Sequence, residues 1–298
     1  MNRIESLLVA TDFSDDARAA QQRAVRLAAR LGARLELLHV MSGPSLSTLR
    51  ELFNLAADAG ATLIEDARRQ LEEMAAALAG QDAPAPATQL RVGHVVNEIL
   101  AAAAQHDMLV VGAHGTNPLR DFILGTTAER LLNRSKRPML VVKRPPQVPY
   151  RRVLVPVDFS PYAAIALRGA LSIAPDAEIT LFHAFDNPYE GNLWLAGVGD
   201  DLIHRYRLQA QQQALGRIDD LLAACGHPPH CFRLVEHGSA APLILAREAD
   251  LDIDLIVIGR HGQQALEELL IGSVTRHVIT DAKCDVLVVS GQPGASGA

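Results

Sequence analysis

The sequence has few cysteines, no long apolar run and little basic charge, and each scarcity excludes a class of protein. Three cysteines in 298 residues are too few, and odd in number, for a disulfide framework, which favours a reducing compartment. No apolar stretch reaches the length of a membrane span, and the first five residues lead directly into a strand rather than a secretory signal. A net charge of −6 argues against a broad nucleic-acid surface, which needs clustered Lys and Arg. We therefore expect a cytoplasmic protein without membrane or nucleic-acid partners.

Short apolar runs alternate with helical stretches along the rest of the chain and predict an α/β fold. Such runs are typical of parallel strands buried on both faces, and the Ala- and Leu-rich tracts between them favour helices. Ser14 is placed to cap the first helix and Gly32 to end it, and a long helical tract is expected from about 47 to 78. The expected strands are 6–10, 35–40, 89–93, 109–111 and 139–142, then 153–157, 179–182, 231–235, 256–258 and 286–289. The pattern indicates two Rossmann-like, doubly wound domains, each with a five-stranded parallel sheet.

Proline-rich residues 145–149 separate two halves that repeat one another. Asp12 and Asp158 are 146 positions apart. The separation is 147 positions for three glycine pairs, which are Gly112 and Gly259, Gly115 and Gly262, and Gly125 and Gly272. So constant a separation indicates an internal duplication. We expect domains at 1–146 and 147–298, with a disordered tail at 291–298.

Each half carries a glycine pattern after its fourth expected strand. The pattern is Gly-x-x-Gly, nine further residues, and then a Gly-hydroxyl pair where a helix begins. Glycine allows a sharp turn and close approach of a ligand, and a helix N-terminus offers N–H groups to a phosphate. Asp12 and Asp158 end the first strands, so if strands one and four are neighbours, a carboxylate suited to ribose hydroxyls faces the same crevice. The alternative is that the glycines are only tight turns and Asp12 only a helix cap.

These residues resemble the universal stress protein family in its tandem two-domain form. The resemblance rests on Thr11-Asp12-Phe13-Ser14, Val157-Asp158-Phe159-Ser160, both glycine motifs and the closing apolar strands. It implies an ATP-binding branch, a sheet order of 3-2-1-4-5 and adenine near the end of strand two. Two departures stand out: Thr126-Thr127-Ala128 replaces hydroxyl-Val-hydroxyl in the first copy, and Asp285 stands where the first half has the more usual Pro138.

The motifs and the resemblance together give a predicted set of nucleotide contacts. In the first half they are Ala10, Thr11, Asp12, Val40, Val111, Gly112, His114, Gly115, Gly125, Thr126 and Thr127. In the second half they are Pro156, Val157, Asp158, Ala184, Ile258, Gly259, Arg260, His261, Gly262, Gly272, Ser273, Val274 and Thr275. ATP is the expected ligand, with Mg²⁺ or Mn²⁺ bridging its phosphates rather than held by a protein cage.

No catalytic residue and no protein metal site are predicted. Cys225, His227, His230 and Cys231 are four possible zinc ligands within seven residues, but tetrahedral sites usually space their ligands differently. A loop that enters the third strand explains them more simply. Histidines 114 and 261 lie inside the glycine turns, where a base would need an orienting partner, and none can be read from the sequence.

Three functions compete. The first is a nucleotide-dependent stress regulator, and the second a slow ATP-hydrolysing or adenylyl-using enzyme. The third is a nucleotide-free interaction protein, which the intact glycine motifs disfavour. Against the enzyme, the sequence has no Gly-x-x-x-x-Gly-Lys-[Ser/Thr] loop and no Cys nucleophile on the glycine turns. We expect the regulator, with at most a weak ATPase activity.

Two further expectations concern assembly and affinity. The apolar last strands, 139–142 and 286–289, are sheet edges that need cover, so the halves are expected to pair as a pseudo-twofold intramolecular dimer; a homodimer of the whole chain is an alternative. The second half is expected to bind more tightly, because it offers Ser273, Thr275 and Arg260 near the phosphates, which should outweigh the loop charges Arg120 and Glu267.

Overall fold

The computed structural model describes residues 4–43, 59–80, 85–115, 124–146, 148–186, 200–262 and 271–290. The chain divides into two compact units, Asn2–Pro149 and, together with Met1, Tyr150–Ala298. The expected tail at 291–298 and the loop charges Arg120 and Glu267 lie outside the described residues. The expected pairing of the two halves stays a prediction.

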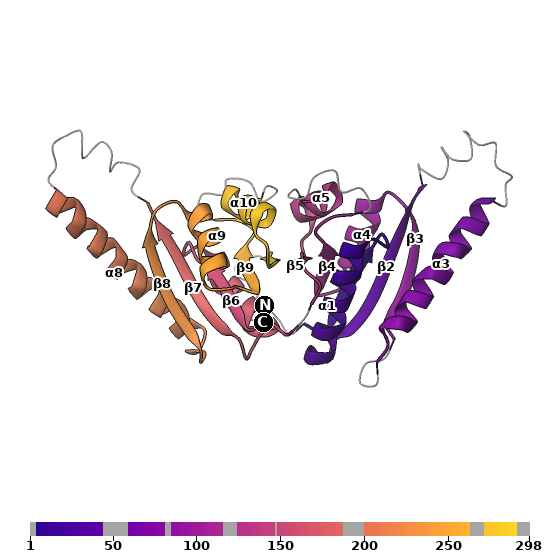
Figure 1. The fold of residues 1–298 in the computed structure, drawn as a ribbon, viewed down its shortest axis with the longest axis horizontal. Helices are drawn as coiled ribbons and strands as arrows, with labels where there is room; N and C mark the ends of the chain where they lie inside the picture. Colours follow the sequence, from indigo (N-terminus) through magenta and orange to yellow (C-terminus); the bar gives the residue numbers. More distant parts are fainter. Residues whose placement is uncertain are drawn as a thin grey trace, which may run out of the picture. The chain divides into compact units, whose positions relative to one another are not determined.

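The first unit alternates strands and helices around a parallel sheet (Figure 1). Its strands are β1 (Ser6–Thr11), β2 (Arg34–Ser42), β3 (Ala87–Gly93), β4 (Met108–Gly112) and β5 (Met139–Val142). Its helices are α1 (Asp15–Leu31), α3 (Ala59–Leu78), α4 (Val95–Ala103) and α5 (Thr126–Arg134). Neighbouring strands follow the order β3-β2-β1-β4-β5, and every pair is parallel. The order changes direction between β1 and β4, which is where ligands bind in open α/β sheets.

The second unit repeats this plan. Its strands are β6 (Arg152–Pro156), β7 (Glu178–Phe185), β8 (Cys231–His237), β9 (Leu255–Gly259) and β10 (Asp285–Val289). Its helices are α6 (Pro161–Ile173), α8 (Asp200–Ala224), α9 (Ala240–Asp250) and α10 (Ser273–Asp281). The strands run in the order β8-β7-β6-β9-β10, all parallel. The predicted fold class, an α/β fold with a parallel sheet in each of two domains, is confirmed.

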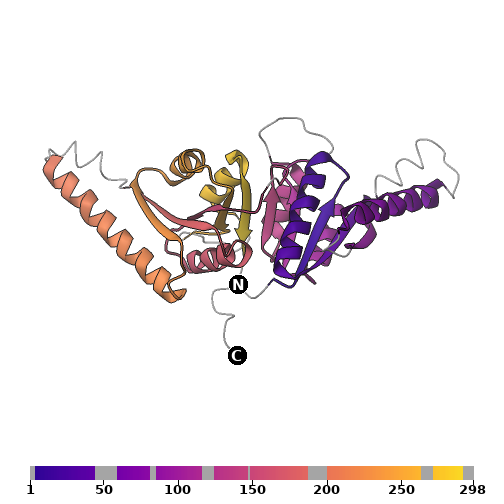
Figure 2. The ribbon, with the colours of Figure 1, turned by 60° about the horizontal axis from the view of Figure 1, so that its bottom comes forward.

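The apolar strands are buried as their composition predicts. Leu7, Leu8 and Val9 of β1 have no exposed surface, and neither do Leu109 and Val110 of the neighbouring β4. Helices cover the strands. Helix α1 lies on β1 and β4, and α3 and α8 lie along the edge strands β3 and β8 of their own units (Figure 2). Helix α4 contacts α5. Apolar burial of this kind is worth about 25 cal/mol per Å² and is the main source of the fold's stability.

Local signals place the ends of α1 correctly. The Ser14 side chain accepts a hydrogen bond from the backbone N–H of Ala17, and Gly32 adopts the left-handed conformation at φ 64°. The strands β7 and β8 run further than expected, to Phe185 and His237, because they pair with each other along that whole length. Polar residues such as His183 occur there, so a search for apolar runs ends each strand too early.

Candidate functional site

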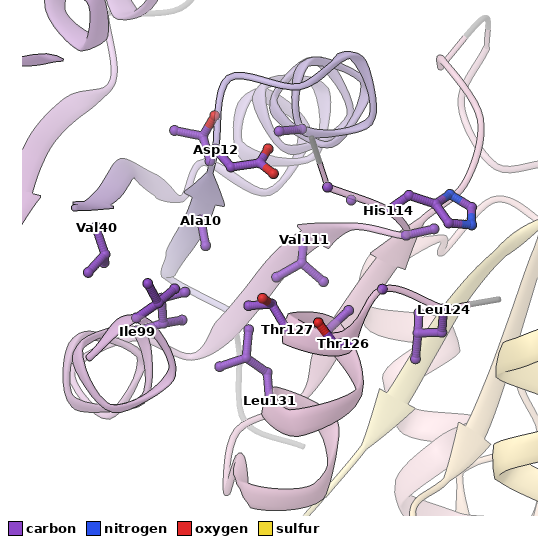
Figure 3. A pocket seen from close by; sticks show the side chains of 18 of the residues that line it. Ala10, Asp12, Val40, Ile99, Val111, His114, Leu124, Thr126, Thr127 and Leu131 are labelled. Carbon is purple, nitrogen blue, oxygen red and sulfur yellow. The ribbon is translucent and has the colours of Figure 1, made fainter. Parts of the chain in front are cut away.

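The carboxyl ends of β1 and β4 open into a cavity of about 490 Å³ in the first unit (Figure 3). Strand pairing sets this geometry, because Leu7 to Val9 are in register with Met108 to Val110, so both strands end side by side. All the predicted contacts of the first half line this cavity: Ala10, Thr11, Asp12, Val40, Val111, Gly112, His114, Gly115, Gly125, Thr126 and Thr127. Residues more than a hundred positions apart in the sequence thus share one pocket.

Asp12 supports the start of α1 and also borders the pocket. Its Oδ1 accepts hydrogen bonds from the backbone N–H of Ser14 at 3.1 Å and from the Ser14 hydroxyl at 2.6 Å. Ser14, not Asp12, is the residue that caps the helix. The other oxygen, Oδ2, faces the glycine turn, because a Cβ atom placed on Gly115 would lie 2.7 Å from it. The cap alternative therefore does not account for the whole carboxylate.

The glycine turn and the start of α5 form a cradle that side chains would fill. A Cβ on Gly112 would lie 2.7 Å from the backbone carbon of Asp16, and one on Gly125 would lie 3.3 Å from the carbonyl oxygen of Ala113. Gly125 is the N-cap of α5 and gives its first turn no side-chain hydrogen bond. Backbone N–H groups at such a helix start suit a phosphate, so the cradle fits the phosphates of a nucleotide.

The opposite end of the first pocket is apolar. Leu38 and Val40 of β2 lie there with Val95 and Ile99 of α4. Next to them, the His39 ring contacts Phe13, with centroids 4.3 Å apart, and its Nδ1 lies 2.8 Å from the Thr11 carbonyl oxygen. The apolar wall fits a planar base. Among the four residues of this wall, only Val40 was predicted from the sequence. The apolar face of α4 is the signal that could have found Val95 and Ile99, and the apolar composition of β2 the signal for Leu38.

The second unit has the matching cavity, of about 760 Å³. Asp158 Oδ1 accepts from the Ser160 backbone N–H at 3.0 Å, and a Cβ on Gly262 would lie 2.8 Å from Asp158 Oδ2. In both units the aspartate thus accepts from the backbone N–H two residues later and faces the second turn glycine, but Ser160 gives α6 no side-chain cap as Ser14 gives α1. The predicted contacts that line this cavity are Pro156, Val157, Asp158, Ala184, Ile258, Gly259, His261, Gly262, Gly272, Ser273, Val274 and Thr275.

Arg260 lies apart from the other predicted contacts of the second half. Its residue is only 6% exposed and does not line the cavity. The Arg260 backbone N–H donates to the Val289 carbonyl of β10 at 3.0 Å, which continues the strand pairing and holds the residue in the buried interior. Thr275 is also less available than expected, because its hydroxyl donates to the Gly259 carbonyl at 2.8 Å. Of the three residues expected to favour the second pocket, Ser273 and Thr275 line it.

The second pocket instead contains a cation that sequence reasoning missed. The Arg217 guanidinium of α8 lies 4.0 Å from the centroid of the Phe159 ring, which in turn contacts the His183 ring at 4.4 Å. Burial lowers the pKa of His183, and the positive charge of Arg217 lowers it further. Arg217 comes from the middle of a 25-residue helix, where no spacing marked it. The described lining of the first pocket has no Lys or Arg.

The departure at Asp285 has a structural explanation. This residue is 2% exposed, and its Oδ2 accepts a hydrogen bond from the Tyr150 hydroxyl at 2.7 Å. Just before it, the Lys283 and Cys284 N–H groups donate to Glu248 Oε1 at 2.7 and 2.6 Å. The first half has Pro138 at the position of Asp285. The second half therefore anchors the start of its last strand through buried carboxylates.

The Cys-His segment forms a turn into β8. His227 and His230 have positive φ angles of 51° and 57°, and Cys225 and Cys231 are free thiols whose pKa values burial raises. Across the described ranges, no group of three or more His, Cys, Asp or Glu side chains is arranged to hold a metal ion. In the same part of the chain, no helix is both long and apolar enough to cross a membrane.

Comparison with known proteins identifies the family. The family model of the universal stress protein family matches twice, over residues 3–143 and 149–290. The chain therefore belongs to the universal stress protein family, with two copies of its domain in tandem. A universal stress protein of Mycolicibacterium smegmatis is 27% identical over 306 residues, which cover 95% of this chain and 96% of that protein.

Comparison with solved structures shows a shared fold. A universal stress protein from Archaeoglobus fulgidus superposes with a TM-score of 0.63 at 18% identity, covering 96% of this chain and 98% of that chain, and so has the same fold. A further match, at 25% identity over 47% of this chain and 98% of that chain with a TM-score of 0.35, is a universal stress protein in complex with cAMP.

Proposed function

We propose that this protein is an ATP-binding universal stress protein that acts as a nucleotide-dependent regulator, with one nucleotide in each pocket. The observation that carries the proposal is the repeated grouping, in each unit, of a strand-end aspartate, two turn glycines and a helix start around one cavity. Because the two cavities share this grouping, they fit the same kind of ligand.

Each part of the pocket fits a part of ATP. The apolar end near Val40 takes the adenine, the Asp12 carboxylate takes ribose hydroxyls, and the glycine turn with the start of α5 takes the phosphates. We assign Mg²⁺ or Mn²⁺ to bridge the phosphates, as these ions do in sites with few protein ligands. Domain bounds of 1–146 and 147–298 and a cytoplasmic location remain part of the proposal.

Calorimetric titration with Mg-ATP tests the proposal. We expect two binding events in the micromolar range, of which Asp12→Ala removes the first and Asp158→Ala the second. Asp66→Ala is the matched control, since Asp66 lies on α3 in an exposed ion pair with Arg69 and should change neither event. Absence of heat and of any thermal shift at millimolar ATP would leave the nucleotide-free interaction protein as the better reading. Tighter binding of cAMP than of ATP would redirect the proposal to cyclic nucleotides.

A further inference from the structure

The glycine turn of the first unit contains a histidine with an orienting carboxylate. His114 Nδ1 lies 2.7 Å from Asp16 Oδ2, and the backbone N–H of His114 donates to the same oxygen at 3.0 Å. About a third of each side chain is exposed, 30% for His114 and 35% for Asp16. His114 lines the pocket and Asp16, from the first turn of α1, does not. The Asp16 carboxylate therefore holds the His114 ring without itself lining the pocket.

This contact fixes which nitrogen of His114 carries the proton. An ionised carboxylate only accepts hydrogen bonds, so the neutral imidazole must donate from Nδ1. Its Nε2 then holds a lone pair. A carboxylate that orients a histidine in this way is the arrangement by which enzymes prepare a general base.

The second unit has no carboxylate at the corresponding position. The position that corresponds to Asp16 is Tyr162, 146 residues later, and its ring lies 5.6 Å from that of His261. A phenol does not replace a carboxylate as a charged acceptor. His261 is moreover only 7% exposed. The two pockets therefore differ in chemistry although they share the aspartate and the glycines.

His114 lies at the phosphate end of its pocket. In Figure 3, His114 and Leu124 lie at one end and Val40 and Ile99 at the other, with Thr126 nearer to the first end. A nucleotide whose base occupies the apolar end and whose phosphates reach the start of α5 brings its terminal phosphate towards His114.

We propose that the first pocket hydrolyses the nucleoside triphosphate that it binds, with His114 as the general base and Asp16 as its positioning residue, and that the second pocket binds without hydrolysis. This inference rests on the proposed nucleotide binding. A water oxygen attacks the terminal phosphorus, and the bond from that phosphorus to the bridging oxygen breaks with its electron pair on the diphosphate. His114 Nε2 accepts the water proton. The products are a nucleoside diphosphate and inorganic phosphate, and the proton passes to solvent.

The test measures binding and phosphate release separately in the full chain with Mg-ATP. His114→Asn keeps an amide donor for Asp16 and removes the base, so phosphate release should fall about 10²-fold or more while ATP affinity changes little. Asp16→Asn should lower kcat with little change in KM. His277→Asn is the control, because His277 forms an exposed pair with Asp281 at 3.0 Å on α10 and should release phosphate at the wild-type rate.

Nitrogen NMR of the imidazole gives a readout independent of turnover. Wild-type His114 should be protonated at Nδ1, and Asp16→Asn should populate the Nε2–H tautomer. Unchanged phosphate release in His114→Asn, an Nε2–H tautomer in the wild type, or ATP binding without any release would each overturn the inference. These outcomes leave nucleotide binding intact. Loss of the proposed function would instead be seen as no ATP binding at all.

Discussion

Two glycines three positions apart in the first unit, Gly112 and Gly115, should respond differently to replacement by alanine. One replacement should lower the stability of the unit, and the other should weaken nucleotide binding. A Cβ on Gly112 would lie 2.7, 2.8 and 3.0 Å from the carbon and oxygen of Asp16 and the nitrogen of Ala17, all backbone atoms of α1. Carbon contacts are comfortable only near 3.5–4.0 Å. The helix would have to move, and overpacking of this kind costs about 1–3 kcal/mol. Gly112→Ala should therefore lower the melting temperature of the unit by about 2–10 °C.

Gly115→Ala should instead reduce binding. Its Cβ would lie 2.7 Å from Asp12 Oδ2, the end of a side chain that can turn away. Asp12 Oδ1 is held by Ser14, so the rotation withdraws the carboxylate from its ribose position. Hydrogen bonds to a charged group are worth about 1.5–3 kcal/mol, or about 10- to 150-fold in the Kd of the first pocket. Stability should change by less than about 1 kcal/mol.

Thermal melting and calorimetric titration with ATP separate the two effects. Gly80→Ala is the control, because a Cβ there meets nothing within 4 Å and neither quantity should change. If Gly115→Ala destabilised the unit as much as Gly112→Ala, or left the affinity for ATP unchanged, the reasoning about the turn would be refuted.

Three further predictions concern the second unit. Glu248→Ala leaves the buried Cys284 N–H and the partly buried Lys283 N–H without their acceptor and should cost about 2–4 kcal/mol in urea unfolding. Glu248→Gln keeps an amide oxygen and should cost less; equal losses would contradict this. Arg217→Gln should weaken ATP binding in the second pocket alone and raise the pKa of His183 in an NMR titration, and a lowered pKa would contradict it. Because the pKa of His183 is lowered in the folded protein, the contribution of His183 to stability is complete above the ordinary value of 6.5 and is lost as pH falls through the folded value. His183→Gln should therefore reduce the loss of stability between about pH 7.5 and about pH 5.5. If the variant lost as much stability as the wild type over this range, His183 would not be the cause.

The sequence predicted well what depends on local pattern and on repetition. Both ends of α1 and the buried strands follow from Ser14, Gly32 and apolar composition, and the repeated spacing led to both pockets. No sequence signal marks the places where side chains meet only through the fold. Arg260 was expected at the phosphates because it lies inside a glycine turn, but pairing of the turn with β10 buries it.

Two groups were missed for the same reason. Arg217 enters the second pocket from α8, far along the chain, and Asp16 meets His114 across 98 positions. A spacing motif cannot report a contact that is set by the packing of a helix against a strand. The predicted tighter binding by the second half stays a prediction. The cation that supports it is now Arg217, which lines the second pocket, rather than Arg260.

The covalent duplication has a consequence for how the sites can evolve. In a symmetric homodimer one gene encodes both sites, so a mutation at the position of Asp16 changes both copies at once. Here Asp16 and Tyr162 are separate codons, and either copy can specialise while the other keeps the ancestral chemistry. Synthesis as one polypeptide also fixes the ratio of the two kinds of site at one to one, at any protein concentration. A tandem chain thus provides the asymmetry of a heterodimer without needing a second gene or regulated assembly.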